Sequence, residues 1–165
     1  MTLITPATAS DIPLIRELTY KIWPQTYSPI LAKEQIEYML DKMYSPASLE
    51  QQMNSKHFFI IGRDEKDVPV GFASYSEIEK EIFKLHKLYV LPARQGQGIG
   101  KDLLEFITND IRFMGAKALD LNVNRYNHNA KAFYEKNGFI IIREEDIDIG
   151  GGYFMNDFVL RLYLD

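Results

Sequence analysis

The chain has 165 residues, of which 46% are hydrophobic and 25% charged, and a formal net charge of -4. These values lie close to the average for globular proteins and exclude fibrous and largely disordered chains; the length suits a single domain over residues 1–165. The chain has no cysteine, which excludes disulfides, thiolate metal sites and a cysteine nucleophile, and fits a reducing compartment.

The basic residues are scattered along the chain. The 19 Lys and Arg form no run or patch that would neutralise a phosphate backbone, so we expect no nucleic-acid partner. The first residues lack the basic and apolar regions of a leader peptide, and no apolar stretch approaches the roughly 20 residues that span a bilayer. We therefore expect a cytoplasmic protein with no membrane partner.

The N-terminal third predicts a short strand followed by helices. Alternation over residues 3–7 indicates a strand, and Ser10 and Asp11 favour a helix start. Apolar residues at helical spacing predict helices over residues 12–22 and 32–43, with a short third over 48–53. Pro24 is expected to end or bend the first helix.

Four aromatic residues gather around the ends of these helices. They are Trp23, Tyr27, Tyr38 and Tyr44. Large aromatic side chains at such joints more often fill a core than contact a substrate, and we interpret them in that way.

Three strands follow, over residues 58–64, 68–78 and 81–90. They are rich in β-branched and aromatic residues and are separated by short polar turns, which predicts an antiparallel meander. The third strand is the longest apolar run, so we place it at the centre of the sheet.

The rest of the chain alternates helices and strands. An amphipathic helix begins at Ile99 and ends at Gly115, a C-cap. The segments after it predict a strand over residues 118–123, a short helix over 130–138, and strands over 139–146 and 154–164. Together these elements indicate an α/β (α+β) fold in which helices flank a mixed, mostly antiparallel sheet of about seven strands.

A glycine-rich turn lies between a strand and the amphipathic helix. It comprises Gln95, Gly96, Gln97, Gly98, Ile99, Gly100 and Lys101. Glycines let the backbone approach a ligand, and free N–H groups at a helix N-terminus bind phosphate oxygens, so a pyrophosphate is the expected guest. The turn lacks the Gly-Lys-Ser/Thr ending of a P-loop and the glycine spacing of a dinucleotide fingerprint. A plain tight turn is the alternative.

Two segments resemble the GNAT acetyltransferases. Residues 88–100 are similar to their acyl-CoA motif, with Gln95, Gly98 and Gly100 at the Arg/Gln-x-x-Gly-x-Gly/Ala positions. Residues 127–139 are similar to their Asn-x-x-Ala-x-x-Phe/Leu-Tyr-x-x-x-Gly-Phe segment. The two motifs stand in the family's order, and the resemblance covers residues 2–164.

The resemblance implies acetyl-CoA as co-substrate, no metal, and a site where the strand before the turn splays from the next strand. Leu88, Tyr89 and Val90 would pair with the pantetheine arm and hold the thioester carbonyl. The pyrophosphate would lie on the turn, that is on Gln95, Gly96, Gln97, Gly98, Ile99 and Gly100, with Lys101 adding charge. Asn127 would bind the pantetheine, although Asn124, Asn127 or Asn129 can instead cap the helix.

The implied reaction is direct attack of a primary amine on the thioester. A backbone N–H near Val90 would stabilise the oxyanion, and Tyr134 would protonate the leaving thiolate unless it is only a packed aromatic. His86 is the candidate base, at a position where arylalkylamine acetyltransferases resemble it in carrying histidine; its ordinary pKa of about 6.5 suits the role. A strand histidine facing solvent, or Glu77 or Glu79 acting through water, are the alternatives.

The acceptor stays open. The acidic run Glu144, Glu145, Asp146 and Asp148 is usually a solvated face. If it lines the acceptor cleft it favours a polyamine-like small molecule, and the N-terminal helices resemble those of bacterial spermidine and diamine acetyltransferases. A protein N-terminus or an amino acid is an alternative acceptor, and a catalytically silent CoA-binding sensor is an alternative of another class. The resemblance also leaves a homodimer through the last strands open, because several relatives pair there.

Overall fold

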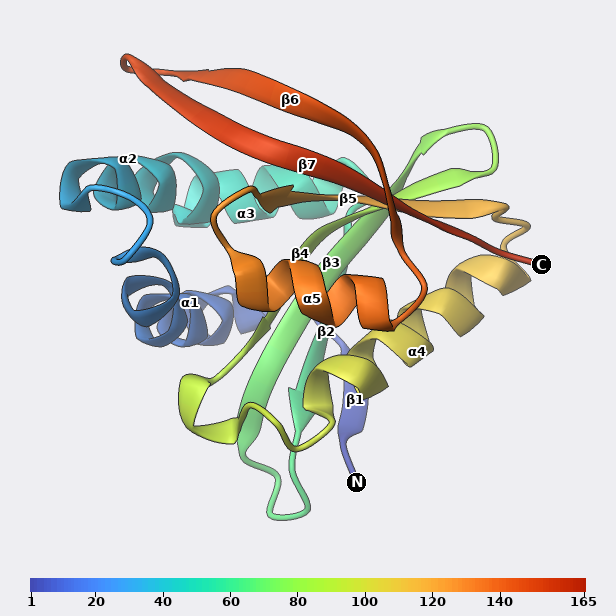
Figure 1. Cartoon of the computed structure of the whole chain (residues 1–165). Coiled ribbons are helices and arrows are strands. Elements are labelled where there is room, and N and C mark those ends of the chain that lie inside the picture. The colour runs from blue at the N-terminus through green and yellow to red at the C-terminus, as the bar shows by residue number, and fades with distance from the viewer. The chain divides into compact units, whose positions relative to one another are not determined.

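A computed structural model describes all 165 residues of the chain. Seven strands form a sheet in the order β1-β2-β3-β4-β5-β7-β6 (Figure 1). The strands are β1 Leu3–Pro6, β2 Phe58–Arg63, β3 Pro69–Glu79, β4 Ile82–Val90, β5 Ala118–Asn124, β6 Ile140–Gly150 and β7 Tyr153–Tyr163. The helices are α1 Ile12–Tyr27, α2 Lys33–Tyr44, α3 Pro46–Asn54, α4 Ile99–Phe113 and α5 His128–Lys136, with short 3-10 turns η1 Ala9–Asp11 and η2 Pro92–Arg94. The mixed α/β class is confirmed, and β4 takes the central place expected of it.

The chain divides into two compact units. The first comprises Met1–Ser76 and Lys87–Ile107, and the second comprises Glu77–His86 and Thr108–Asp165. Three elements, β3, β4 and α4, therefore contribute to each unit.

In the first unit, helices cover antiparallel strands. β2 pairs with both β1 and β3, with Ile60 opposite Pro6 and Ala73. Helices α1, α2 and α3 contact one another. Their buried apolar side chains include Ile15, Ile22, Met39 and Leu49 and lie at the helical spacing seen in the sequence. Helix burial here follows the periodicity that predicted it.

Helix α1 continues through Pro24 to Tyr27, so of the two expected effects of Pro24, an end or a bend, the end of the helix does not occur there. Pro24 lies in the last turn, where its ring removes one backbone hydrogen bond, the one to Tyr20, and no further turn depends on it. The Pro24 carbonyl still accepts the Ser28 N–H at 3.1 Å. The start of the helix is as expected, because α1 begins at Ile12 with Asp11 as its N-cap. The Asp11 carboxylate also accepts the Thr8 N–H at 2.9 Å.

In the second unit, β4 and β5 run parallel, with Ile82 opposite Ala118 and Leu85 opposite Leu121. β7 pairs antiparallel with β5 and with β6, its partner in a long hairpin (Figure 1). Alternation along β5 divides the two faces of these strands. One face carries Leu119, Leu121 and Val123, and the other carries Asp120, Asn122 and Asn124. A buried strand with polar residues on one whole face needs partners for them, and β7 supplies several.

Candidate active site

The glycine-rich turn of the first unit has the backbone that only glycine adopts without strain. Gly96 has φ 80° and Gly98 has φ 84°, both in the left-handed region. A Cβ added at either residue would meet no atom within 4 Å. The space beside both residues is therefore open, and a ligand can approach the backbone there.

The turn leads directly into the N-terminus of α4. The first hydrogen bond of the helix runs from Asp102 N–H to Gly98 O at 3.0 Å. The N–H groups of Ile99, Gly100 and Lys101 come before it and have no carbonyl one turn earlier within the helix. They carry the positive end of the helix dipole, which favours phosphate oxygens. The predicted phosphate-binding loop thus has suitable geometry.

The strand before the turn is fixed by close backbone contacts. Leu91 N–H donates to Val70 O at 2.9 Å, and a Cβ on Gly71 would lie 2.7 Å from Tyr89 O. β3 therefore lies against the end of β4 at a distance that only glycine permits. Gln95 Nε2 donates to Val90 O at 3.3 Å, which ties the turn to the strand end. These contacts join Tyr89, Val90 and Gln95 in one small region.

Tyr134 lies in α5 of the second unit and is 8% exposed. Its ring meets those of Phe133 and Phe139 edge-on, with centroids 5.2 Å and 5.4 Å away. Packing of the ring therefore fixes the position of the phenol hydroxyl, as a proton donor would require. Packing and a chemical role are compatible at this residue.

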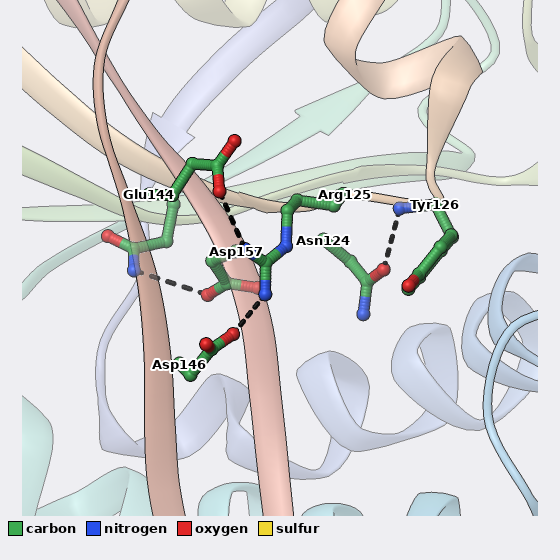
Figure 2. Close-up of polar contacts among 7 residues, drawn as sticks. Asn124, Arg125, Tyr126, Glu144, Asp146 and Asp157 are labelled. Carbon is green, nitrogen blue, oxygen red and sulfur yellow. Dashed lines mark hydrogen bonds and ion pairs between the residues drawn. The ribbon is translucent and has the colours of Figure 1, made fainter.

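Asn127 is the N-cap of α5. Its side chain accepts a hydrogen bond from Ala130 N–H at 3.3 Å, and its own N–H donates to Asn124 O at 2.9 Å. Of the three asparagines that can cap the helix, Asn127 does so, and this hydrogen bond uses the Oδ1 of its amide. Asn124 has another role, because its Oδ1 accepts Tyr126 N–H at 2.9 Å (Figure 2).

The residues considered for proton removal lie on β3 and β4. His86 is half-buried near the middle of β4, whereas Glu77 and Glu79 are exposed at the end of β3. No group of three or more His, Cys, Asp or Glu side chains is arranged to hold a metal ion. None of the helices has the length and apolar character needed to cross a bilayer.

Comparison with known families identifies this arrangement. Residues 27–151 match the model of the acetyltransferase (GNAT) domain, which covers both the glycine-rich turn and the segment with Asn127 and Tyr134. The chain belongs to the GNAT acetyltransferases. It is accordingly an acyltransferase enzyme, and the resemblance seen in the two motifs is confirmed.

Individual GNAT relatives agree over most of the chain. The N-acetyltransferase YjgM of Escherichia coli is 31% identical over 79% of this chain and 84% of its own. The ribosomal protein bS18-alanine N-acetyltransferase of Haemophilus ducreyi is 28% identical over 85% of this chain and 95% of its own. The crystal structure of the PaiA N-acetyltransferase of Thermoplasma acidophilum with coenzyme A has a TM-score of 0.84, 25% identity and 99% coverage of both chains.

Sequence reasoning missed an ion pair beside the glycine-rich turn of this GNAT enzyme. Arg94 donates from Nη1 to Asp64 Oδ2 at 2.9 Å and from Nε to Gln97 Oε1 at 3.0 Å. The hydrogen bond from Arg94 lowers the pKa of the Asp64 carboxyl. Arg94 therefore ties the turn after β2 to the turn before α4. Sequence gave no signal for it, because 30 residues separate the partners.

Aromatic residues of the first unit form a cluster around Trp23. The Trp23 ring lies 4.6 Å from Tyr27, 5.4 Å from Tyr44 and 6.0 Å from Tyr89. Trp23 and Tyr44 are buried, as a core role predicts, whereas Tyr27 and Tyr89 are half-buried and share a hydrogen bond between their hydroxyls at 3.0 Å. Burial raises the pKa of Tyr44 well above its ordinary value.

Lys87 was also missed. Its Nζ lies 5.2 Å from the centre of the Tyr44 ring and 5.6 Å from that of Phe59, and it donates to Gln52 Oε1 at 2.6 Å. Burial lowers the pKa of Lys87 to about 8. The charged form is therefore disfavoured in the folded chain, although the ring faces and the amide compensate part of the cost.

We expect the stability of the protein to rise between pH 8 and 10.5 because of Lys87. In that window the unfolded chain holds a proton on Lys87 that the folded chain has released, since the folded pKa is about 8 and the ordinary value is 10.5. In Lys87→Met this contribution disappears, so the difference in unfolding free energy between the two proteins should change by about 3 kcal/mol across the window. Urea unfolding at several pH values measures it.

The exposed Lys66 supplies the control. Lys66→Met should leave the pH dependence of the wild type intact. Tyr44 lowers stability above pH 10 in all three proteins, so the comparison isolates Lys87. Parallel pH profiles for wild type and Lys87→Met would contradict the assignment.

The acidic run lies on β6, and its carboxylates already have partners. Arg125 forms ion pairs with Glu144 at 3.0 Å and with Asp146 (Figure 2). Glu145 accepts from Arg143 Nε at 2.6 Å. Asp148 accepts the N–H of Gly150 at 2.8 Å, within the turn that leads to β7. Much of the negative charge of the run is therefore compensated within the chain.

Proposed function

We propose that the protein transfers the acetyl group of acetyl-CoA to the primary amine of a small molecule. The observation that carries the proposal is the glycine-rich turn, where Gly96 and Gly98 have positive φ and open space beside them at the N-terminus of α4. The membership of the chain in the GNAT family supplies the reaction class. The PaiA structure that resembles it was determined with coenzyme A, which supports the same co-substrate here.

The residues present fit acetyl-CoA. The N–H groups of Ile99, Gly100 and Lys101 would receive the pyrophosphate, with Gln95, Gly96, Gln97 and Gly98 forming the turn before them. Leu88, Tyr89 and Val90 would offer backbone groups to the pantetheine arm. Asn127 uses Oδ1 as a helix cap, so its contact with pantetheine would come from Nδ2. When bound, acetyl-CoA supplies a thioester, an acyl group activated for transfer.

The reaction then requires two proton transfers and the stabilisation of one negative charge. An alkyl amine with a pKa near ~10 is mostly protonated at neutral pH, so a base has to remove a proton before attack. His86 is the base that the sequence indicates. A backbone N–H near Val90 would stabilise the charge that develops on the carbonyl oxygen, and the Tyr134 hydroxyl would donate its proton to the leaving sulfur.

For the acceptor we propose a small primary amine, with polyamines as one class to test. The acidic run on β6 would attract a cationic acceptor, but two arginines, Arg125 and Arg143, already form ion pairs with three of its carboxylates and offset two of its negative charges. A polyamine therefore has less free negative charge to meet there than the sequence suggests.

A protein N-terminus is a second candidate acceptor. It is favoured by the likeness to the ribosomal protein bS18-alanine N-acetyltransferase of Haemophilus ducreyi, which extends over 95% of that relative. An α-amino group has an ordinary pKa of about 7.7–8.0, so less work is needed to deprotonate it than an alkyl amine.

A panel of acceptors tests these candidates. Purified protein with acetyl-CoA is offered spermidine, a diamine, an arylalkylamine, an amino acid and an Ala-initiated peptide, and release of free thiol is followed. We expect turnover with at least one small amine above the rate without acceptor. Turnover with the peptide alone would move the proposal to a protein N-terminus, and CoA binding without any turnover would favour a silent sensor.

A further inference from the structure

Asp157 on β7 is a buried carboxylate with one oxygen unpaired. The residue is 1% exposed. Its Oδ2 accepts from Asn122 Nδ2 at 3.2 Å, whereas its Oδ1 is buried and has no hydrogen-bond partner. Buried polar atoms without a partner are rare, because each costs the free energy of desolvation that a hydrogen bond would offset. Such an atom calls for an explanation beyond folding.

Asp120 shows what a structural carboxylate on the same strands is like. It is 5% exposed, and Arg161 donates two hydrogen bonds to it, from Nε to Oδ1 at 2.7 Å and from Nη2 to Oδ2 at 2.9 Å. Both oxygens are thereby satisfied and the charge is neutralised. Asp157 has one amide donor and no cation in hydrogen-bonding contact, so the two carboxylates differ in what they can still accept.

Asp157 lies beside the segment that carries the second GNAT motif. On β7 it is opposite Asn124 of β5 and Glu145 of β6. The neighbouring Asn156 accepts Arg125 N–H at 2.9 Å, and Asn124 accepts Asn127 N–H at the same distance. Asp157 thus lies in strand register with Asn124, whose carbonyl is hydrogen-bonded to Asn127, the N-cap of α5, the helix that holds Tyr134.

The surroundings make this carboxyl a better base than an exposed aspartate. Burial raises the pKa of Asp157, and the Asn122 hydrogen bond lowers it. Of the charged groups around it, Lys84 of β4 and Arg125 lower the pKa and Glu145 of β6 raises it. The net direction is upward, toward a group that binds a proton more readily.

We propose that Asp157 is the base that deprotonates the acceptor amine, an assignment that rests on the proposed acetyl transfer. One N–H bond of the ammonium group breaks and its proton bonds to Oδ1. The electron pair stays on nitrogen, which becomes the nucleophile. Because Oδ1 is shielded from bulk solvent, the proton arrives along a hydrogen bond from the amine or from one water between them. This gives Asp157 the role for which the sequence indicates His86.

A buried, unpaired carboxylate should also affect the stability of the protein. A carboxyl with a raised folded pKa stabilises the protein fully at pH values below its unfolded pKa, and the contribution is lost as pH rises through the folded pKa. Above the folded pKa the buried charge is therefore a cost. Asp157→Asn keeps an oxygen for Asn122 and removes the charge, so it should not lower the melting temperature at pH 7, whereas loss of a purely structural carboxylate should.

The test compares pH profiles of kcat/KM for wild type, Asp157→Asn, Asp157→Glu, Asp120→Asn and His86→Gln with the best amine of the panel. In the wild type, kcat/KM should fall at low pH as the base becomes protonated; this fall is the acidic limb of the profile. We expect Asp157→Asn to lower kcat/KM about 100-fold or more and to abolish the acidic limb, with CoA affinity unchanged. Asp157→Glu keeps a carboxylate and should recover part of the rate and the limb. Asp120→Asn should keep the limb and melt at lower temperature.

Three results would overturn the assignment. One is an acidic limb that persists in Asp157→Asn with near wild-type rate; a second is a limb that is lost in His86→Gln only. The third is a rate in Asp157→Glu no higher than in Asp157→Asn. Failure of the proposed function looks different, since then the wild type itself binds CoA and acetylates no amine, which removes both proposals together.

Discussion

Tyr134→Phe should lower kcat for acetyl transfer about 100-fold or more while leaving CoA affinity nearly unchanged. The substitution removes only the hydroxyl, so the leaving sulfur would have to depart as an unprotonated thiolate. The ring would keep its edge-on contacts with Phe133 and Phe139, at 5.2 Å and 5.4 Å between centroids. Steady-state kinetics with the best acceptor, together with calorimetric titration of CoA, measures both effects.

Tyr163→Phe is the matched control. Tyr163 belongs to the same unit as Tyr134 but is 63% exposed, so loss of its hydroxyl should change neither kcat nor CoA affinity. A kcat for Tyr134→Phe within about threefold of wild type would mean that the hydroxyl is not the proton donor. Tyr134 would then be only a packed aromatic.

Gly98→Ala should weaken CoA binding by a factor of 10 or more, roughly, and slow turnover accordingly. Alanine at φ 84° is strained by about 1–2 kcal/mol, and its methyl group would occupy the open space beside the turn. Both effects disturb the N–H groups at the start of α4 that are proposed to receive phosphate. Calorimetric titration with CoA gives the affinity.

Gly115→Ala separates strain from binding. Gly115 follows the other end of α4, has φ 87° and, like Gly98, would place a Cβ with no atom within 4 Å. The two substitutions should therefore destabilise the fold similarly, which thermal unfolding shows, but only Gly98→Ala should lose CoA affinity. Equal CoA affinity in both variants would show that the turn does not bind the co-substrate.

The sequence predicted the secondary structure well because its periodicities are strong. The apolar spacing over residues 12–22 and 32–43 and the β-rich run over residues 58–90 correspond to helices and strands in the structure. Pro24 does not end α1, because it lies in the last turn of the helix, where local propensity has little effect. Strand β6 also reaches Gly150, because pairing with β7 carries the acidic run into the sheet.

The site was predictable only where the functional residues form a motif of neighbouring residues in the sequence. The glycine-rich turn and the segment around Tyr134 are local motifs, so sequence alone singled them out. Lys87 depends on Gln52, and Asp157 on Asn122, each 35 residues away along the chain. A sequence shows that Asp157 is acidic, but burial and the unpaired oxygen exist only in the folded chain.

The most direct test of the central claim is a balance of products. Wild-type protein is incubated with isotope-labelled acetyl-CoA and the best acceptor, and free CoA thiol and labelled N-acetylamine are quantified in the same sample by mass spectrometry. We predict that the two products appear in equal amounts and that both fall together in Tyr134→Phe. Thiol release without acetylated amine, or CoA binding with neither product, would contradict the account.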